Sequence, residues 1–190
     1  MNPAELLELA DSVLALAGPE EQMEVAVSAG HSTSVKVYGG EVESYTSADS
    51  SGAGVRLIVD GREGFASAGT LDRDILASLV SDARDNATFA EPDEFAGIAE
   101  PDGVEPIEVD TWRDDVLQLT ADQRIEWAVD LERRTLAAHP AITGVRTATF
   151  SDSAGAAALV STSGLRSGDR STSVSSFVQA LAVDGDRTQT

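Results

Sequence analysis

The first apolar residues of the chain recur at helical spacing. Leucine, valine and alanine side chains stand three or four positions apart from Pro3 to Ala17, which predicts an amphipathic helix over that range. Asn2 is suited to cap the first turn, and the fixed φ angle of Pro3 suits the first helical position. Gly18 and Pro19 are expected to end this helix.

From Met23 onward the apolar side chains alternate with polar ones, which is the period of a half-buried strand. Gly39-Gly40 and Asp60-Gly61 are turn sequences that tolerate positive φ angles, and each stands between two alternating segments. The sequence therefore predicts two neighbouring hairpins. Their strands are expected around residues 23–28 and 35–37 and over Glu41–Tyr45, Val55–Val59 and Arg62–Ser67.

A second helix is predicted after the hairpins, with Thr70 as its N-cap. Asp72 and Asp74 would lie in its first turn, where the helix dipole favours acidic groups. Apolar residues between Ile75 and Ala83 form a single stripe at helical spacing, so this helix is expected to cover a sheet.

Residues 89–115 have no regular hydrophobic period. They are rich in acidic residues and are interrupted by Pro92, Pro101 and Pro106. We interpret this stretch as a linker or as an extended segment that crosses the molecule.

The second half of the chain repeats the sequence of helix followed by strands. Thr120 and Gln123 form a capping box for a helix that runs toward Pro140. Strands are then predicted over Gly144–Phe150, Ala156–Val160 and Val174–Val183, with turns at Ser163-Gly164 and Asp184-Gly185.

These elements predict an α+β protein with two subdomains, each a helix packed on a mostly antiparallel sheet built from hairpins. The first subdomain is predicted at residues 1–88, the acidic connector at 89–115 and the second subdomain at 116–190. Because so few residues follow the last hairpin signal, we expect this chain to be cut from a longer protein.

The composition excludes several classes of function. The 190 residues include 33 Asp and Glu, 13 Lys and Arg, and no cysteine, for a net charge of −20. This charge disfavours nucleic acid as a partner, and the lack of cysteine excludes disulfides and thiolate metal ligands. The sequence shows neither a signal peptide nor an apolar run long enough for a membrane span, so a cytoplasmic location without membrane contact is expected.

The two histidines do not form a recognisable metal motif. His31 and His139 are far apart in sequence, and neither stands in an H-E-x-x-H arrangement. We interpret His31 as a turn residue rather than a general base. His139 is expected to interact with the C-terminus of the helix before Pro140.

The glycine-rich segments resemble known catalytic and phosphate-binding loops only in part. Gly64–Gly69 has the wrong spacing for a nucleophile elbow, so close packing of a strand is the better interpretation. Gly52-Ala53-Gly54 lacks the third glycine and the helix of a dinucleotide site. Lys36 is followed by Val37, which excludes a phosphate loop of the G-K-[ST] type.

The remaining candidates also have simpler structural interpretations. The pairs Asp114/Asp115 and Glu126/Asp130 arise readily in so acidic a chain, and Asp130 is expected to pair with Arg134 one turn away. Asn86-Ala87-Thr88 matches a glycosylation acceptor, but no secretion signal accompanies it. The aromatic residues are interpreted as core or interface anchors, namely Tyr45, Phe65 and Trp127. The sequence therefore predicts no catalytic, cofactor-binding or metal-binding residue in this chain.

Two stretches together resemble a known family. The first is Val35–Glu43 followed by Gly52–Arg56 and Gly61–Ser67, and the second is Leu119–Ile142 with Ser161–Gly164. In order and spacing they resemble the N-terminal part of the TldD/PmbA family, also called modulators of DNA gyrase. Within it, the chain is more similar to the PmbA branch, also called TldE.

The resemblance implies a role in a heterodimeric zinc metalloprotease that acts on small or unfolded polypeptides. A TldD-type subunit is the implied partner, with a homodimer as the other possibility. Zinc is expected in the TldD-type partner or in a C-terminal β-rich domain that this chain lacks, because the family's H-E-x-x-x-H motif is absent here. This chain would then supply scaffold and substrate wall, with exposed hairpin edges that accept extended peptides by strand addition.

Two alternatives remain open at the level of sequence. The chain could be a peptide-binding or assembly module without a protease, since no catalytic signature is present. It could also modulate DNA gyrase through protein contacts, because its charge disfavours contact with DNA itself.

Overall fold

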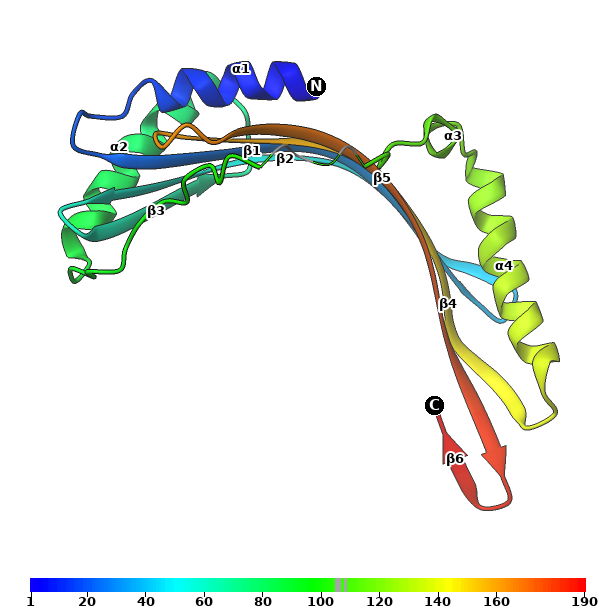
Figure 1. Cartoon of the computed structure of the whole chain (residues 1–190). Coiled ribbons are helices and arrows are strands. Elements are labelled where there is room, and N and C mark those ends of the chain that lie inside the picture. Colours follow the sequence, from blue (N-terminus) through cyan, green and yellow to red (C-terminus); the bar gives the residue numbers. More distant parts are fainter. Residues whose placement is uncertain (105–106, 108) are drawn as a thin grey trace. The chain divides into compact units, whose positions relative to one another are not determined.

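The structure is a computed structural model that describes residues 1–104, 107 and 109–190, so Pro106 of the predicted connector lies outside the described residues. Figure 1 shows helices together with one sheet, which confirms the predicted α+β class. The helices are α1 (Pro3–Leu14), α2 (Arg73–Phe89), α3 (Asp114–Leu117) and α4 (Ala121–Ala138). The strands are β1 (Gln22–Tyr38), β2 (Glu41–Val59), β3 (Arg62–Ala68), β4 (Ile142–Ser161), β5 (Arg166–Asp184) and β6 (Arg187–Gln189). None of the described helices is long and apolar enough to cross a membrane.

The six strands form one sheet in the order β3-β2-β1-β4-β5-β6. Four of them are much longer than the hydrophobic pattern predicts: β1 has 17 residues, β2 and β5 have 19 each, and β4 has 20. The predicted turns are all present, and the glycines in them have the positive φ angles that such turns require. These turn glycines are Gly39, Gly40, Gly61, Gly164 and Gly185.

The chain forms two compact units, and the four long strands contribute to both. Unit 1 comprises residues 1–30, 50–111 and 155–171, and unit 2 comprises residues 31–49, 112–154 and 172–190. Each unit therefore combines stretches that are far apart in sequence, and each is described separately below.

In unit 1, α1 and α2 bury one face of the sheet. Alternate residues of β1 and β2 point into this core, as the burial of Val25 and Val55 at 0% exposure illustrates. The intervening residues form the opposite face, where no helix of unit 1 packs. Asn2 caps α1, as predicted, and also forms a capping box with Glu5. The helix ends at Leu14, earlier than the predicted Ala17.

The start of α2 differs from the prediction. The N-cap is Asp72 rather than Thr70, because the Asp72 carboxylate accepts hydrogen bonds from the amides of Asp74 and Ile75. The Thr70 hydroxyl accepts a hydrogen bond from the Asp72 amide instead, because Thr70 lies two residues before the N-cap position.

The acidic stretch after α2 crosses the end of the unit 1 sheet. The Asp93 amide donates to the Gly61 carbonyl at the β2–β3 turn, and the Ile98 amide donates to the Gln22 side chain at the start of β1. Further along, the Ala99 carbonyl accepts from the Ser163 hydroxyl at the β4–β5 turn. This part of the stretch is therefore an extended crossing segment.

Gly64 is the point of closest approach between β3 and α2. A Cβ atom there would lie 1.9 Å from the carbonyl oxygen of Ala83 and 2.6 Å from the amide nitrogen of Ala87. Backbone atoms cannot move aside as a flexible side chain can, so only glycine fits. The predicted interpretation of the Gly64–Gly69 segment as a closely packed strand is confirmed.

We therefore expect Gly64→Ala to lower the free energy of unfolding by about 3 kcal/mol, because α2 would have to move away from the sheet. Chemical denaturation of the chain would measure this. Gly69→Ala is the matched control: nothing lies within 4 Å of a Cβ at Gly69, so little change is expected. Equal stability of the two variants would contradict the packing described here.

A second link in unit 1 is an ion pair between α2 and the loop after α1. Arg84 donates from Nε and Nη2 to the Glu21 carboxylate at 2.5 and 2.9 Å, and the Gly18 amide donates to the same carboxylate at 2.6 Å. The hydrogen bonds from Arg84 are the main cause of a lowered pKa for Glu21, and they outweigh the opposing effect of burial.

This lowered pKa predicts a dependence of stability on pH. The folded chain holds the Glu21 proton less tightly than the unfolded chain, so the stabilisation is complete above the ordinary pKa of 4.5 and is lost as pH falls below it. Glu21→Gln should lower the free energy of unfolding by about 1–2 kcal/mol at pH 7 and by less at pH 3. Glu20→Gln, an exposed neighbour, is the control, and a difference independent of pH would refute the assignment.

Candidate functional site

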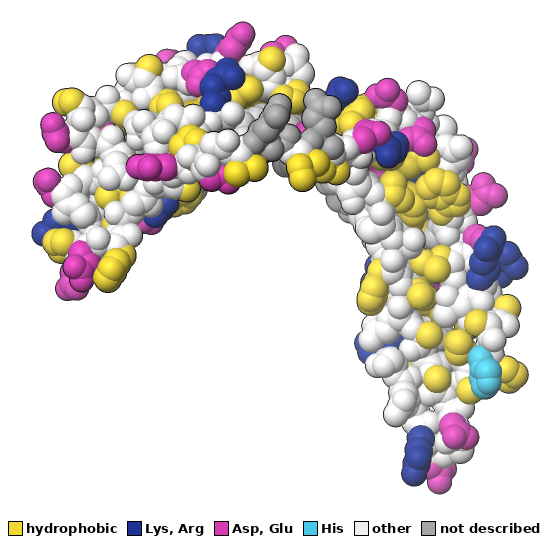
Figure 2. All heavy atoms as spheres, viewed as in Figure 1, with side chains coloured by type: hydrophobic (Ala, Val, Ile, Leu, Met, Phe, Trp, Pro, Cys, Tyr) yellow, Lys and Arg dark blue, Asp and Glu magenta, His cyan; other side chains and the backbone are white. Residues whose placement is uncertain are grey.

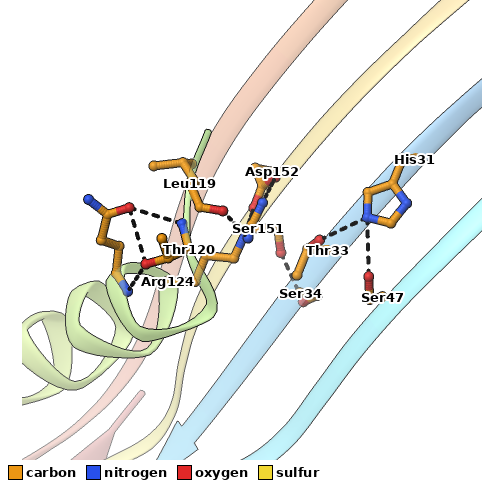
Figure 3. Close-up of polar contacts among 10 residues, drawn as sticks. His31, Thr33, Ser34, Ser47, Leu119, Thr120, Arg124, Ser151 and Asp152 are labelled. Atoms are coloured by element: carbon orange, nitrogen blue, oxygen red, sulfur yellow. Dashed lines mark hydrogen bonds and ion pairs between the residues drawn. The ribbon is translucent and has the colours of Figure 1, made fainter. Parts of the chain in front are cut away.

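A row of polar side chains lies along the central strands of unit 2 (Figure 3). His31 Nδ1 lies 2.8 Å from the Asp49 carboxylate, while Nε2 lies 3.1 Å from the Ser47 hydroxyl and 3.4 Å from that of Thr33. The prediction that His31 is a turn residue is wrong, because it lies within β1. Gly30 and the Ser/Thr run beside it have no apolar alternation, so their sequence did not indicate a strand.

The contacts of His31 with Ser47 on one side and Asp49 on the other resemble those of a catalytic triad, in which a base activates a nucleophile and a carboxylate orients the base. The environment does not match that chemistry. The side chains of His31 and Asp49 are 46% and 91% exposed, so water competes for every contact that would activate the serine. We therefore assign these contacts to the pairing of β1 with β2.

A buried ion pair joins α4 to β4. Arg124 donates from Nε and Nη2 to the Asp152 carboxylate at 2.5 and 2.9 Å, and its side chain and that of Asp152 are only 11% and 5% exposed. A third hydrogen bond runs from Arg124 Nη1 to the Leu119 carbonyl at 2.6 Å. The bond to Asp152 is the main cause of a raised pKa for Arg124, so this side chain stays charged.

A second buried carboxylate holds the hairpin between β1 and β2. Glu132 of α4 is 3% exposed, and its two oxygens accept hydrogen bonds from the amides of Gly39 and Gly40 at 2.7 and 2.6 Å. Both glycines have positive φ angles, which aims consecutive amides at one anion. The turn and α4 are therefore fixed to each other.

We expect Glu132→Gln to lower the free energy of unfolding by about 2 kcal/mol, because the new amide group would oppose one backbone donor inside the protein. Faster hydrogen exchange at Gly39 and Gly40 should accompany the loss. Glu126→Gln on the exposed part of the same helix should change neither property. Unaltered exchange at the two glycines would show that Glu132 does not hold the turn.

The other predicted candidates have structural roles. His139 is the C-cap residue of α4, and its Nδ1 accepts from the Ala141 amide at 3.1 Å, on the side of the following strand. Asp130 forms the predicted ion pair with Arg134, and the pKa of its carboxyl is lowered mainly by a hydrogen bond from Arg133. The Asn86 side chain donates to the Phe65 carbonyl on β3.

The three aromatic residues are partly exposed, so they are not core residues, and their predicted role as interface anchors stays a prediction. Tyr45 and Phe65 are 40% and 56% exposed, so neither belongs to the core. Trp127 is 45% exposed and makes an edge contact with the buried ring of Phe150, at a centroid distance of 4.8 Å.

Zinc, which the family resemblance implies, has no set of ligands in the described part of the chain. No group of three or more His, Asp or Glu residues lies close enough together there to hold a metal ion. The carboxylates of Glu132 and Asp152 are already engaged by backbone amides and by Arg124, so they do not fit such a role.

Two of the open surfaces in the described part of the chain are candidates for partner binding. The first is the outer edge of β2: β3 pairs with β2 only from Ala53 to Val59, so residues 41–52 have β1 as their one partner among the described strands. The second is a hollow of about 660 Å³ on the helix-free face of unit 1, called the open-face hollow below. Sequence reasoning missed the hollow, because its lining comes from five strands.

Comparison with known proteins defines the class of this fold. Residues 23–87 match the model of the PmbA/TldA metallopeptidase domain 1, and residues 114–190 match that of the PmbA/TldA metallopeptidase central domain. The chain therefore belongs to the PmbA/TldD family. No curated protein sequence matches it.

Solved structures share the fold at low sequence identity. A candidate modulator of DNA gyrase from Bacteroides thetaiotaomicron has a TM-score of 0.79 and 21% identity, over 95% of this chain and 42% of that one. A similar candidate modulator from Thermotoga maritima gives 0.76 and 19%, over 95% and 41%. TldE from Thermococcus kodakarensis gives 0.72 and 15%, over 97% and 40%. The chain thus spans about two-fifths of the length of these relatives.

Proposed function

We propose that this chain is the scaffold and substrate-wall region of a PmbA-like subunit in a heterodimeric zinc metalloprotease that degrades small or unfolded polypeptides. Membership of the PmbA/TldD family and the similarity to TldE support the proposal. The zinc would be held by a TldD-type partner, or by a C-terminal domain, rather than by the residues described here.

The free edge of β2 carries this proposal. Residues 41–51 are all exposed, and the β2 backbone there has pairing groups left over on the side away from β1. Such an edge accepts an extended peptide as a further strand, and main-chain hydrogen bonds give affinity without demanding a particular sequence. A protease for unfolded chains needs that kind of tolerance.

Parts of the other strand edges are already engaged. On β3, the Asn86 side chain already donates to the Phe65 carbonyl. On β5, the Arg170 carbonyl accepts from the Thr111 hydroxyl, and the segment continues with the Arg113 amide donating to the Thr172 hydroxyl. The edge of β5 between residues 173 and 181 is also open, because β6 pairs only with residues 182–184. We assign peptide binding to residues 41–52 of β2, because residues 41–51 are all exposed whereas residues 178–181 of β5 are half-buried.

Hydrogen exchange of the full-length protein would test this assignment. Adding a permanently unfolded polypeptide should slow exchange at amides of residues 41–52, while the β1 amides around Val25, which lie inside the sheet, serve as the internal control. Unchanged exchange on β2 at saturating polypeptide would rule out strand addition there.

Peptide cleavage separates the protease from the alternative of an assembly module. Cleavage is expected only when the full-length protein and a TldD-type partner are combined, and a chelator should abolish it. If the pair binds unfolded polypeptide but never cleaves it, the assembly module is the correct interpretation.

A further inference from the structure

The open-face hollow differs from the β2 edge in position and chemistry. It lies wholly within unit 1, across β3, β2, β1, β4 and β5. Glycine, alanine and serine form most of its floor, and Phe65 and Leu159 are the large apolar side chains beside them. Val27 also lines the hollow, but it belongs to the core cluster on the helix-covered face. The floor residues are Ala26, Ser28, Gly52, Gly54, Ser67 and Ala157.

Phe65 forms one end of the hollow. A Cβ atom on Gly54 would lie 3.2 Å from the edge of the Phe65 ring, so the ring leans over the neighbouring strand where no side chain stands. The ring is nevertheless 56% exposed. An exposed aromatic ring held above a glycine is available to stack against a ligand.

Asp169 of β5 stands at the other end. It is exposed, and its carboxylate accepts one hydrogen bond, from the adjacent Arg170 amide at 2.7 Å. Among the described residues no Lys, Arg or His forms an ion pair with it. Asp169 also lines a second hollow of about 400 Å³, which shares Ser28 and Ala157 with the first and is lined by Arg170 as well.

The sheet sets the distance between these two ends. Phe65 and Asp169 lie on β3 and β5, which are separated by four steps in the strand order. At about 4.8 Å per step the two ends are roughly 19 Å apart measured across the strands, which an extended peptide spans with about six residues.

We propose that the open-face hollow binds an extended peptide segment of about six residues that lies across the strands, with an aromatic side chain on Phe65, small residues over the floor and a Lys or Arg at Asp169. The charge of the chain supports a cationic ligand and opposes a second copy, because each copy carries a net charge of −20. This inference rests on the proposed function only in taking a polypeptide as ligand.

Binding of three neutral-ended hexapeptides to the full-length protein would test it. One has Trp at the first position, Lys at the sixth and Ala or Gly between; the second replaces Lys by norleucine; the third places Lys beside Trp. The first should bind three- to fivefold more tightly than the other two, as expected for a partly exposed ion pair.

Variants assign the effect to its residues. Asp169→Asn should remove the advantage of the Lys peptide and leave the norleucine peptide unchanged, whereas Ala157→Leu should weaken both by filling the floor. Asp184→Asn, on the same strand but outside the hollow, is the matched control. Thermal unfolding confirms that each variant is folded.

Three results would overturn the inference: no binding of the first peptide, equal affinity for all three, or the same loss in Asp184→Asn as in Asp169→Asn. Sedimentation showing self-association that Ala157→Leu abolishes would instead assign the hollow to a second copy. Failure here is distinct from failure of strand addition, because Asp169→Asn leaves the β2 edge intact and should not alter the protection of its amides by unfolded polypeptide.

Discussion

One-sided burial is the constraint on which this structure depends. In unit 1 two helices supply the apolar surface for one face of the sheet, and the buried residues of β1 and β2 are those that meet them. Neither helix of unit 1 packs on the opposite face, so the side chains there must be compatible with contact with water. Small and hydroxyl-bearing side chains meet that requirement, and they also leave the face hollow.

Unit 2 holds its helix on the sheet with fewer apolar core residues and more buried charge than unit 1. Its core cluster consists of Val35, Val37, Ala128 and Phe150, with three partly buried neighbours. The ion pair of Arg124 with Asp152 and the carboxylate of Glu132 fix α4 where a larger core would otherwise do so. Buried charges of this kind cost desolvation energy, so their contribution is orientation more than stability.

Much of the fold could be predicted from local signals. Asn2, Thr120 and Gln123 cap their helices as expected, and the turn glycines have the predicted positive φ angles. The continuity of the strands could not be predicted. Residues 30–34 and 44–51 contain few apolar side chains, and the period of two is visible only where one face is buried.

The candidate sites were harder to predict than the fold. Arg124 and Asp152 stand 28 positions apart, and Glu132 stands 93 positions from Gly39, so no local pattern links them. The open-face hollow depends on the order in which the strands assemble, which hydrophobic periodicity does not encode. Acidic side chains are spread over the face shown in Figure 2 rather than gathered, and total charge alone therefore did not single out Asp169.

The attachment of the β1–β2 turn to Glu132 has a consequence for biosynthesis. The ribosome releases the hairpin tip well before it has made α4, so the nascent hairpin leaves its paired glycine amides to water until about a further hundred residues have emerged. The turn of this hairpin is therefore fixed only after α4 has been synthesised. A chain stalled or cleaved ahead of α4 would keep the strands of unit 2 in an unfinished state, exposed to quality-control proteases.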